Sequence, residues 1–225
     1  MKASSLYFIL IVAFFGIITS GDCNANETEM KLIDAGLVNV NEVDETINVD
    51  LVNSDPDKNF FRENYNNGLN KAYLRKEVAI KLSLAQKYLK SEFPEYSILI
   101  MDAARPRSVS KRMYDKMKGT KFEKYVANPN KGSMHNYGIA VDVTIVDVNG
   151  DEIDMGFTPF FKSNLAIYLE YAKLRVFDLS ESQKHNRNLL SRVMKKAGFI
   201  PLSYEWWHFN GMPKDEAREK YRIIE

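Results

Sequence analysis

The amino-acid sequence predicts an α+β fold in which helices flank a mainly antiparallel central sheet. Strand-like and helix-like segments do not alternate regularly, and the hairpin signal Asn149-Gly150 follows a β-branched run. The composition, with 45% hydrophobic and 27% charged residues, is that of a folded chain rather than a disordered one. The formal net charge of +1 gives no electrostatic reason to expect nucleic acid as a partner.

The first 25 residues are expected to form an export signal rather than part of the fold. Lys2 precedes an apolar run over residues 6–19, which has the length of a signal-peptide core and is short for a membrane span. We therefore expect an exported protein, periplasmic or secreted, with a single domain over residues 26–225. After removal of the signal, no stable membrane insertion is expected.

The end of this signal has more than one interpretation. Small residues favour cleavage after Ala25, and Gly21 is a second candidate. An uncleaved anchor helix is an alternative. A lipid-anchored Cys23 is another, although Asp22 directly before it fits that signal poorly.

The N-terminal third of the remaining chain combines irregular and regular pieces. Residues 26–70 are polar, with strand-like segments at residues 37–40 and 47–52. Residues 53–70 lack a period and predict a wrapping loop. Apolar residues then recur at helical spacing over residues 72–89, which predicts an amphipathic helix.

The middle of the chain predicts two strands and a helix. Residues 96–101 form a short apolar run typical of a buried strand, and residues 102–106 follow it as a loop. Ser108 is expected to cap the next helix. After a Pro/Gly/Asn loop at residues 128–132, the β-branched residues 138–146 predict a strand.

The C-terminal part predicts a capped helix and a final strand. Ser180 with Gln183 three residues later is typical of a capping box, and Gly198 is a helix stop. Residues 199–210 are rich in aromatic residues and predict one last strand.

Histidine scarcity narrows the search for a metal site. Cleavage after Ala25 would remove the only cysteine, so any site must use His, Asp or Glu, and the chain has three histidines. A hydrolytic zinc site needs three protein ligands and an open position for water. His135, Asp142 and His208 can supply them for one Zn²⁺ per chain, whereas His185 is expected to face solvent on the capped helix.

Two further residues would complete a hydrolytic site. Glu205 lies three residues before His208 and can act as general base. Residues three apart on a regular strand face opposite sides, so this role predicts a bulge or a strand end there. Arg105, held between a strand and Pro106, can stabilise negative charge on a peptide carbonyl oxygen, which is worth roughly 3–4 kcal/mol for one well-placed donor.

Two motifs together resemble a known family. Ser-x-His-x-x-Gly-x-Ala-x-Asp at residues 133–142 and Glu-x-Trp-His at residues 205–208 are similar to the zinc D-alanyl-D-alanine dipeptidases of the VanX type, which have the hedgehog/DD-peptidase fold. The resemblance runs from about residue 37 to residue 210. It implies hydrolysis of D-Ala-D-Ala to two D-alanines in cell-wall peptide metabolism, with Ser133 and Tyr125 lining the substrate site.

One departure from the family pattern leaves the substrate open. After Asp154-Met155-Gly156 the family has an acid that faces the substrate amine, and here Phe161 stands near that place. Asp154 or Glu170 can be considered as substitutes. The alternatives are therefore a D,D-carboxypeptidase or other stem-peptide hydrolase, and an inactive zinc-stabilised cell-wall-binding module.

Overall fold

The computed structural model describes residues 20–59, 61–120, 123, 127–156, 179–203 and 205–225. Its central five-stranded sheet has the order β2-β4-β5-β7-β6, in which only β2 and β4 run parallel. The strands are β2 (Asn48–Val49), β4 (Ser97–Asp102), β5 (Ala140–Val146), β6 (Ile200–Leu202) and β7 (Glu205–Asn210). The predicted α+β class with a mainly antiparallel sheet is confirmed.

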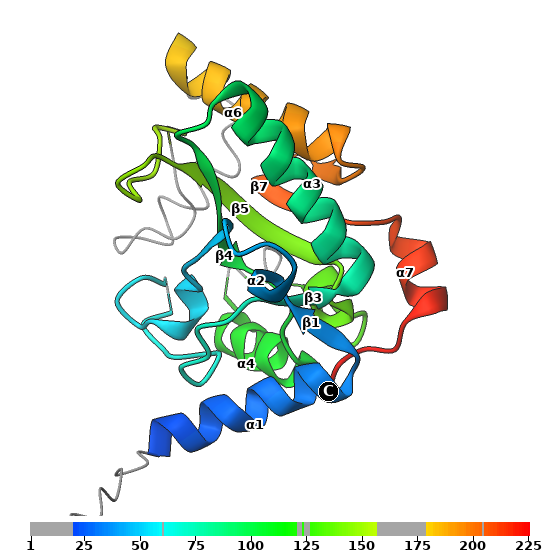
Figure 1. Ribbon diagram of the computed structural model, residues 1–225. Helices are drawn as coiled ribbons and strands as arrows, with labels where there is room; N and C mark the ends of the chain where they lie inside the picture. The colour runs from blue at the N-terminus through cyan, green and yellow to red at the C-terminus, as the bar shows by residue number, and fades with distance from the viewer. Residues whose placement is uncertain (1–19, 60, 121–122, 124–126, 157–178, 204) are drawn as a thin grey trace, which may run out of the picture.

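Two long helices, α3 (Lys76–Glu92) and α6 (Glu181–Lys196), lie side by side along one face of the sheet (Figure 1). The apolar stripe predicted for the first of them is buried, with Val78, Leu82 and Leu89 fully inaccessible to solvent. The helix begins later than predicted. Residues 73–75 instead form β3 (Tyr73–Arg75), which pairs with β1 (Leu37–Asn39) in a separate antiparallel ladder.

The capping prediction for α6 is confirmed. The Ser180 hydroxyl accepts a hydrogen bond from the Gln183 backbone N–H at 3.1 Å, and the Gln183 side chain accepts one from the Ser180 N–H at 3.0 Å. Gly198 follows the helix with φ +88°, a conformation that favours glycine. The prediction for Ser108 is wrong, because α4 (Arg107–Met117) already includes Ser108 and has Pro106 at its N-cap.

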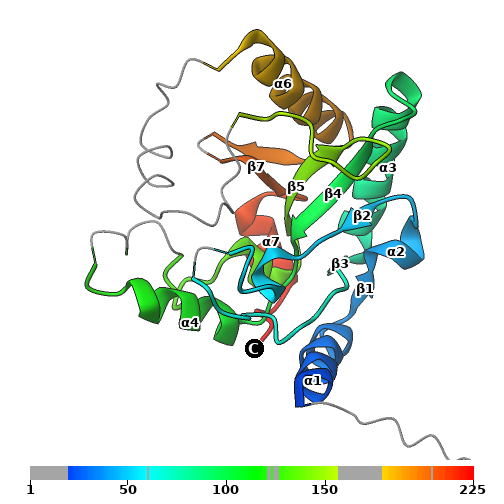
Figure 2. The ribbon, with the colours of Figure 1, turned by 90° about the vertical axis from the view of Figure 1, so that its left-hand side faces the viewer.

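Shorter elements surround this centre. They are α1 (Ser20–Asp34), α2 (Val40–Val43), the 3₁₀ turns η1 (Val52–Ser54) and η3 (Met134–Tyr137), and α7 (Lys214–Lys220) (Figure 2). Helix α1 includes both candidate cleavage positions, and its Leu32 is fully buried. Most of the predicted signal, residues 1–19, lies outside the described residues. In the part that is described, no helix combines the length and apolarity that crossing a membrane requires.

Two ladders of the central sheet, β4–β5 and β6–β7, are irregular. The register between β4 and β5 shifts by one residue between Ile100 and Asp102, so that Asp102 is paired with Asp142. The single strand predicted over residues 199–210 is wrong, because the segment forms the two antiparallel strands β6 and β7. Their register also shifts, and Leu202 is paired with Glu205 rather than with His208. Both irregularities adjoin the predicted site.

Candidate active site

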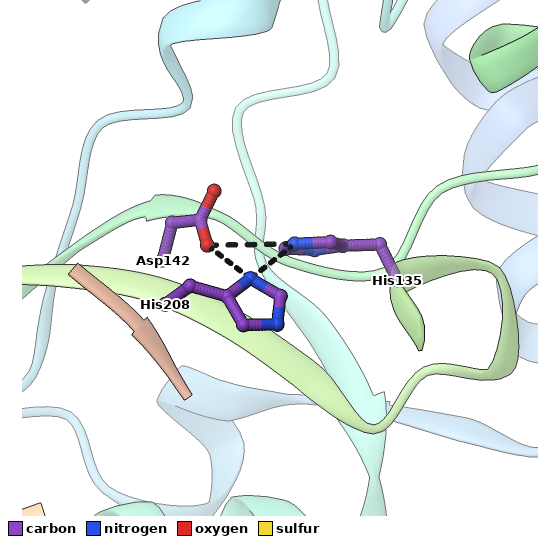
Figure 3. Close-up of side chains that lie close together, drawn as sticks. All are labelled: His135, Asp142 and His208. Carbon is purple, nitrogen blue, oxygen red and sulfur yellow. Dashed lines mark hydrogen bonds and ion pairs between the residues drawn. The ribbon is translucent and has the colours of Figure 1, made fainter. Parts of the chain in front are cut away.

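Three predicted metal ligands converge on one point (Figure 3). Asp142 Oδ1 lies 2.9 Å from His208 Nδ1 and 3.4 Å from His135 Nε2, and the two ring nitrogens are 3.3 Å apart. All three residues are buried. Their donor atoms therefore surround a space of ion size.

Different elements place these three side chains. Asp142 and His208 are register partners on β5 and β7, so their side chains leave the sheet on the same face. His135 comes from η3, which Ser133 caps by accepting from the His135 N–H at 3.4 Å. Gly138 ends this turn at φ +72°, and the chain can then enter β5 directly.

Hydrogen bonds fix which nitrogen of each histidine faces the centre. His135 Nδ1 donates to the Ala103 carbonyl at 2.8 Å, which leaves Nε2 as the free lone pair. His208 Nε2 donates to Asn210 Oδ1 at 3.1 Å, which leaves Nδ1 facing Asp142. Both rings are thus held in the orientation that a metal ligand needs.

The electrostatics of the three residues are those of a cation site. Burial lowers the pKa of His135 to about 4, so its ring is neutral near pH 7. Burial opposes ionisation of Asp142, but the charges and hydrogen bonds of the two histidines outweigh it and lower its pKa. A proton shared between Asp142 and His208 satisfies only those two residues. The lone pair of His135 Nε2 then still faces Asp142 Oδ1 and His208 Nδ1 without a proton of its own. A divalent cation satisfies all three atoms at once, so the donor set fits a metal ion.

Glu205 lies beside this triad, as the sequence predicts. The register shift at the start of β7 turns Glu205 to the side of His208, with Glu205 Oε2 at 3.8 Å from His208 Nδ1. The predicted strand irregularity is therefore present. Burial, reinforced by the negative charge of Asp142, raises the pKa of Glu205 to about 7. A carboxyl group with such a pKa can accept and release a proton near neutral pH.

Arg105 also lies at the site, in the loop between β4 and α4. Only 14% of its side chain is exposed, and its positive charge acts on Asp142 and Glu205. Its guanidinium forms an ion pair with Asp102, and its Nε donates to Ser110 Oγ at 3.3 Å. Its backbone N–H bonds to the His135 carbonyl at 3.2 Å, which links the arginine loop to the ligand turn.

Other predicted residues fall outside this cluster. Ser133 is the N-cap of η3, and its predicted contact with substrate stays a prediction. Tyr125, Phe161 and Glu170 lie outside the described residues. Asp154 is exposed and accepts from Gln183 Nε2 at 3.0 Å, so its carboxylate is bound to α6.

His185 is exposed on α6, as the sequence predicts. Two buried residues of the site were not predicted to have a role. Asp102 contacts Arg105, and Asn210 orients His208. The sequence feature that could have revealed them is a polar residue at the end of a strand: Asp102 ends β4 and Asn210 ends β7.

Two known D-alanyl-D-alanine dipeptidases share part of this sequence. The D-alanyl-D-alanine dipeptidase of Escherichia coli is 28% identical over 129 residues, which cover 56% of this chain and 61% of that protein. The match thus spans less than two thirds of the E. coli protein. The D-alanyl-D-alanine dipeptidase of Synechocystis sp. is 27% identical over 61% of this chain and 68% of its own.

A match to a solved structure of the LD-carboxypeptidase LdcB covers 65% of this chain and 63% of the LdcB chain, with 22% sequence identity and a TM-score of 0.40. The sequence profile of the D-Ala-D-Ala dipeptidase family matches residues 34–223, a range that contains every residue of the cluster described above. The chain therefore belongs to the D-Ala-D-Ala dipeptidase family of peptidases.

Proposed function

We propose that the protein is a zinc-dependent dipeptidase that hydrolyses D-alanyl-D-alanine to two D-alanines in cell-wall peptide metabolism. The triangle formed by His135, Asp142 and His208 is the observation that supports this most directly. Its edges of 2.9, 3.3 and 3.4 Å are close to the separations of about 3.3–3.6 Å between ligands of a tetrahedral zinc ion with bonds of about 2.0–2.2 Å.

The residues around the triangle have complementary roles in peptide hydrolysis. A zinc ion held there would supply Lewis acidity, which polarises a carbonyl and acidifies water. Glu205 accepts the proton of the attacking water and delivers it to the nitrogen of the leaving D-alanine. Arg105 stabilises the negative charge that develops on the carbonyl oxygen. These roles require an acid and a cation that are shielded from solvent beside the ligands, and the side chains of Glu205 and Arg105 are 27% and 14% exposed.

A second candidate is a D,D-carboxypeptidase or another hydrolase of peptidoglycan stem peptides. The position of Asp154 favours this reading, because its carboxylate bonds to Gln183 and to the Gly156 N–H. Among the described residues, Asp154 is thus already bound and exposed rather than directed at a substrate amine. A site that does not pair with a free amine would accept longer peptides.

An inactive zinc-stabilised binding module is the candidate from a different class. A pure binder has no need of the partly buried Glu205, whose pKa is raised to about 7, next to Arg105. The presence of both groups supports an enzyme. Neither Glu205 nor Arg105 is a proposed zinc ligand. Substitution of either should therefore impair hydrolysis while zinc binding is retained, which separates the two classes by experiment.

The test uses the full chain loaded with zinc and a substrate panel of D-Ala-D-Ala, N-acetyl-D-Ala-D-Ala and a stem pentapeptide. We expect D-alanine release from the free dipeptide and a loss of about 10²–10⁴-fold in Glu205→Gln with zinc content retained. Glu216→Gln, an exposed acid on α7, is the matched control. Unchanged hydrolysis in Glu205→Gln would refute the mechanism, and preference for the blocked or longer peptides would favour the second candidate.

We also propose that the protein is exported. The support is the Lys2-led apolar run over residues 6–19. A cut after Ala25 would keep the part of α1 that holds Leu32, which is buried, and Glu29, which accepts from Lys71 at 2.7 Å. N-terminal sequencing of the protein recovered from a periplasmic or secreted fraction would distinguish cleavage after Gly21, cleavage after Ala25 and retention.

A further inference from the structure

A second buried carboxylate lies behind Arg105. Asp102 is 2% exposed, and its Oδ2 forms the ion pair with the guanidinium of Arg105. The same oxygen accepts from Asn53 Nδ2 at 3.2 Å, and Oδ1 accepts from the Ala103 N–H at 3.0 Å. Both oxygens of Asp102 therefore have fixed donors, so the carboxylate is a rigid anchor.

The strand irregularity in β4 directs Asp102 toward the site. Before the shift, Ile100 is paired with Val143, and both belong to the core beneath α3 and α6. In unbroken register Asp102 would be paired with Val141, also a core residue. The extra residue at Met101 moves Asp102 opposite Asp142 and so onto the ligand face of the sheet.

The surroundings of Arg105 explain why an anchor is needed. Its guanidinium is buried and feels the attraction of Asp142 and Glu205, which are a ligand and the proposed base. Unrestrained, the guanidinium would move toward either carboxylate. The ion pair with Asp102 and the hydrogen bond from Nε to Ser110 Oγ restrain it against such movement. These two contacts use Nη1 and Nε, so the anchor leaves the third nitrogen, Nη2, for a substrate oxygen.

We propose that Asp102 is the positioning residue for Arg105, which keeps the guanidinium directed at the reacting carbonyl and away from the ligand carboxylate. This inference rests on the proposed function, in which Arg105 stabilises the developing charge. The ligand side chain His135 has its Nδ1 4.0 Å from Asp102 Oδ2 but donates to the Ala103 carbonyl at 2.8 Å instead. We therefore expect the effect of Asp102 on hydrolysis to pass through Arg105.

The test is a double-mutant cycle on D-Ala-D-Ala hydrolysis with Asp102→Asn, Arg105→Ala and the double variant, each loaded with zinc. We expect Asp102→Asn to lower kcat about 10²-fold, with a smaller change in KM, because misplacement of a catalytic group by about 1 Å has such an effect. In the Arg105→Ala background the same substitution should change kcat less than about 3-fold. Asp44→Asn is the matched control, since Asp44 is partly buried and accepts from Ser83 Oγ at 2.9 Å in another part of the fold.

Two outcomes would overturn the positioning role. One is a wild-type kcat in Asp102→Asn, and the other is an equal loss with and without Arg105. A melting-temperature cycle on zinc-free protein separates this inference from the proposed function. If wild-type protein hydrolyses no peptide, the proposed function fails, and the melting temperatures still decide whether the two residues are coupled.

In that cycle, Asp102→Asn should lower Tm by about 10 °C, because it leaves a buried guanidinium without its counter-charge. Without Arg105, the same substitution removes an unpaired buried carboxylate and should leave Tm unchanged or higher. An equal fall of Tm in both backgrounds would show that Asp102 does not act on Arg105.

Discussion

Asp142 and His208 face each other across two neighbouring antiparallel strands, with Asp142 Oδ1 at 2.9 Å from His208 Nδ1. The sheet therefore supplies two of the three proposed ligands as a rigid pair. His135, the third, reaches the same point from a capped turn. Each part of this arrangement makes a separate prediction.

Zinc content should depend on the clustered histidines and not on the exposed one. His135→Ala and His208→Ala each leave two donors, which is fewer than a stable zinc site needs, so bound zinc should fall well below one per chain. His185→Ala is the matched control and should keep the wild-type content. Elemental analysis after dialysis measures this. Full zinc content in either of the first two variants would refute the assignment of ligands.

Asn210→Ala should weaken zinc binding while it leaves all three ligands in place. Asn210 accepts from His208 Nε2 at 3.1 Å and so holds the ring with Nδ1 toward the centre. Loss of such a partner typically lowers metal affinity about 10–100-fold. Competition with a chelator measures the affinity, and Asn188→Ala, exposed on α6, is the control. Equal affinities in the two variants would mean that Asn210 has no orienting effect.

Gly138→Ala should destabilise the fold more than the same change at Gly150. Both glycines have positive φ, at +72° and +85°, so each substitution introduces backbone strain of about 1–2 kcal/mol. A Cβ at Gly138 would also lie 2.8 Å from Leu37 Cδ2, whereas Gly150 has open space. We expect an additional loss of about 1–3 kcal/mol at Gly138, measured by urea unfolding. Similar losses at both positions would contradict the close approach.

The metal-free protein should lose stability as the pH falls from about 6.5 to about 4. Burial lowers the pKa of His135 from 6.5 to about 4, so between these values the unfolded state binds the proton and the folded state does not. The contribution of His135 is thus complete above pH 6.5 and is lost on acidification. Melting temperatures in the presence of a chelator should fall less steeply over this range in His135→Asn, whereas His185→Asn should match the wild type. Equal slopes in His135→Asn and wild type would contradict the pKa.

Strong local signals explain which elements the sequence predicts correctly. The helical period of α3, the capping box of α6 and the β-branched run of β5 each depend on neighbouring residues, and all three are confirmed. The helices α1 and α7 were not predicted, because polar residues dominate both segments. Ala217 is the single buried residue of α7.

The ligands could be predicted for a different reason. With three histidines in the chain, few sets of donors were possible, and Glu205 three residues before His208 required an irregular strand that is present. The role of Asp102 could not be read in the same way. Its direction depends on the register of β4 against β5, and register is a property of two strands together.

The extra residue at Met101 makes the length of β4 as important as its composition. Deletion of Met101 would straighten the ladder and still leave Asp102 opposite Asp142, so the carboxylate would keep its face of the sheet. One residue inserted after Met101 would instead bring Asp102 opposite Val141 and turn its charge into the apolar layer beneath the long helices. Any redesign of this strand must therefore avoid lengthening it between Ile100 and the acid.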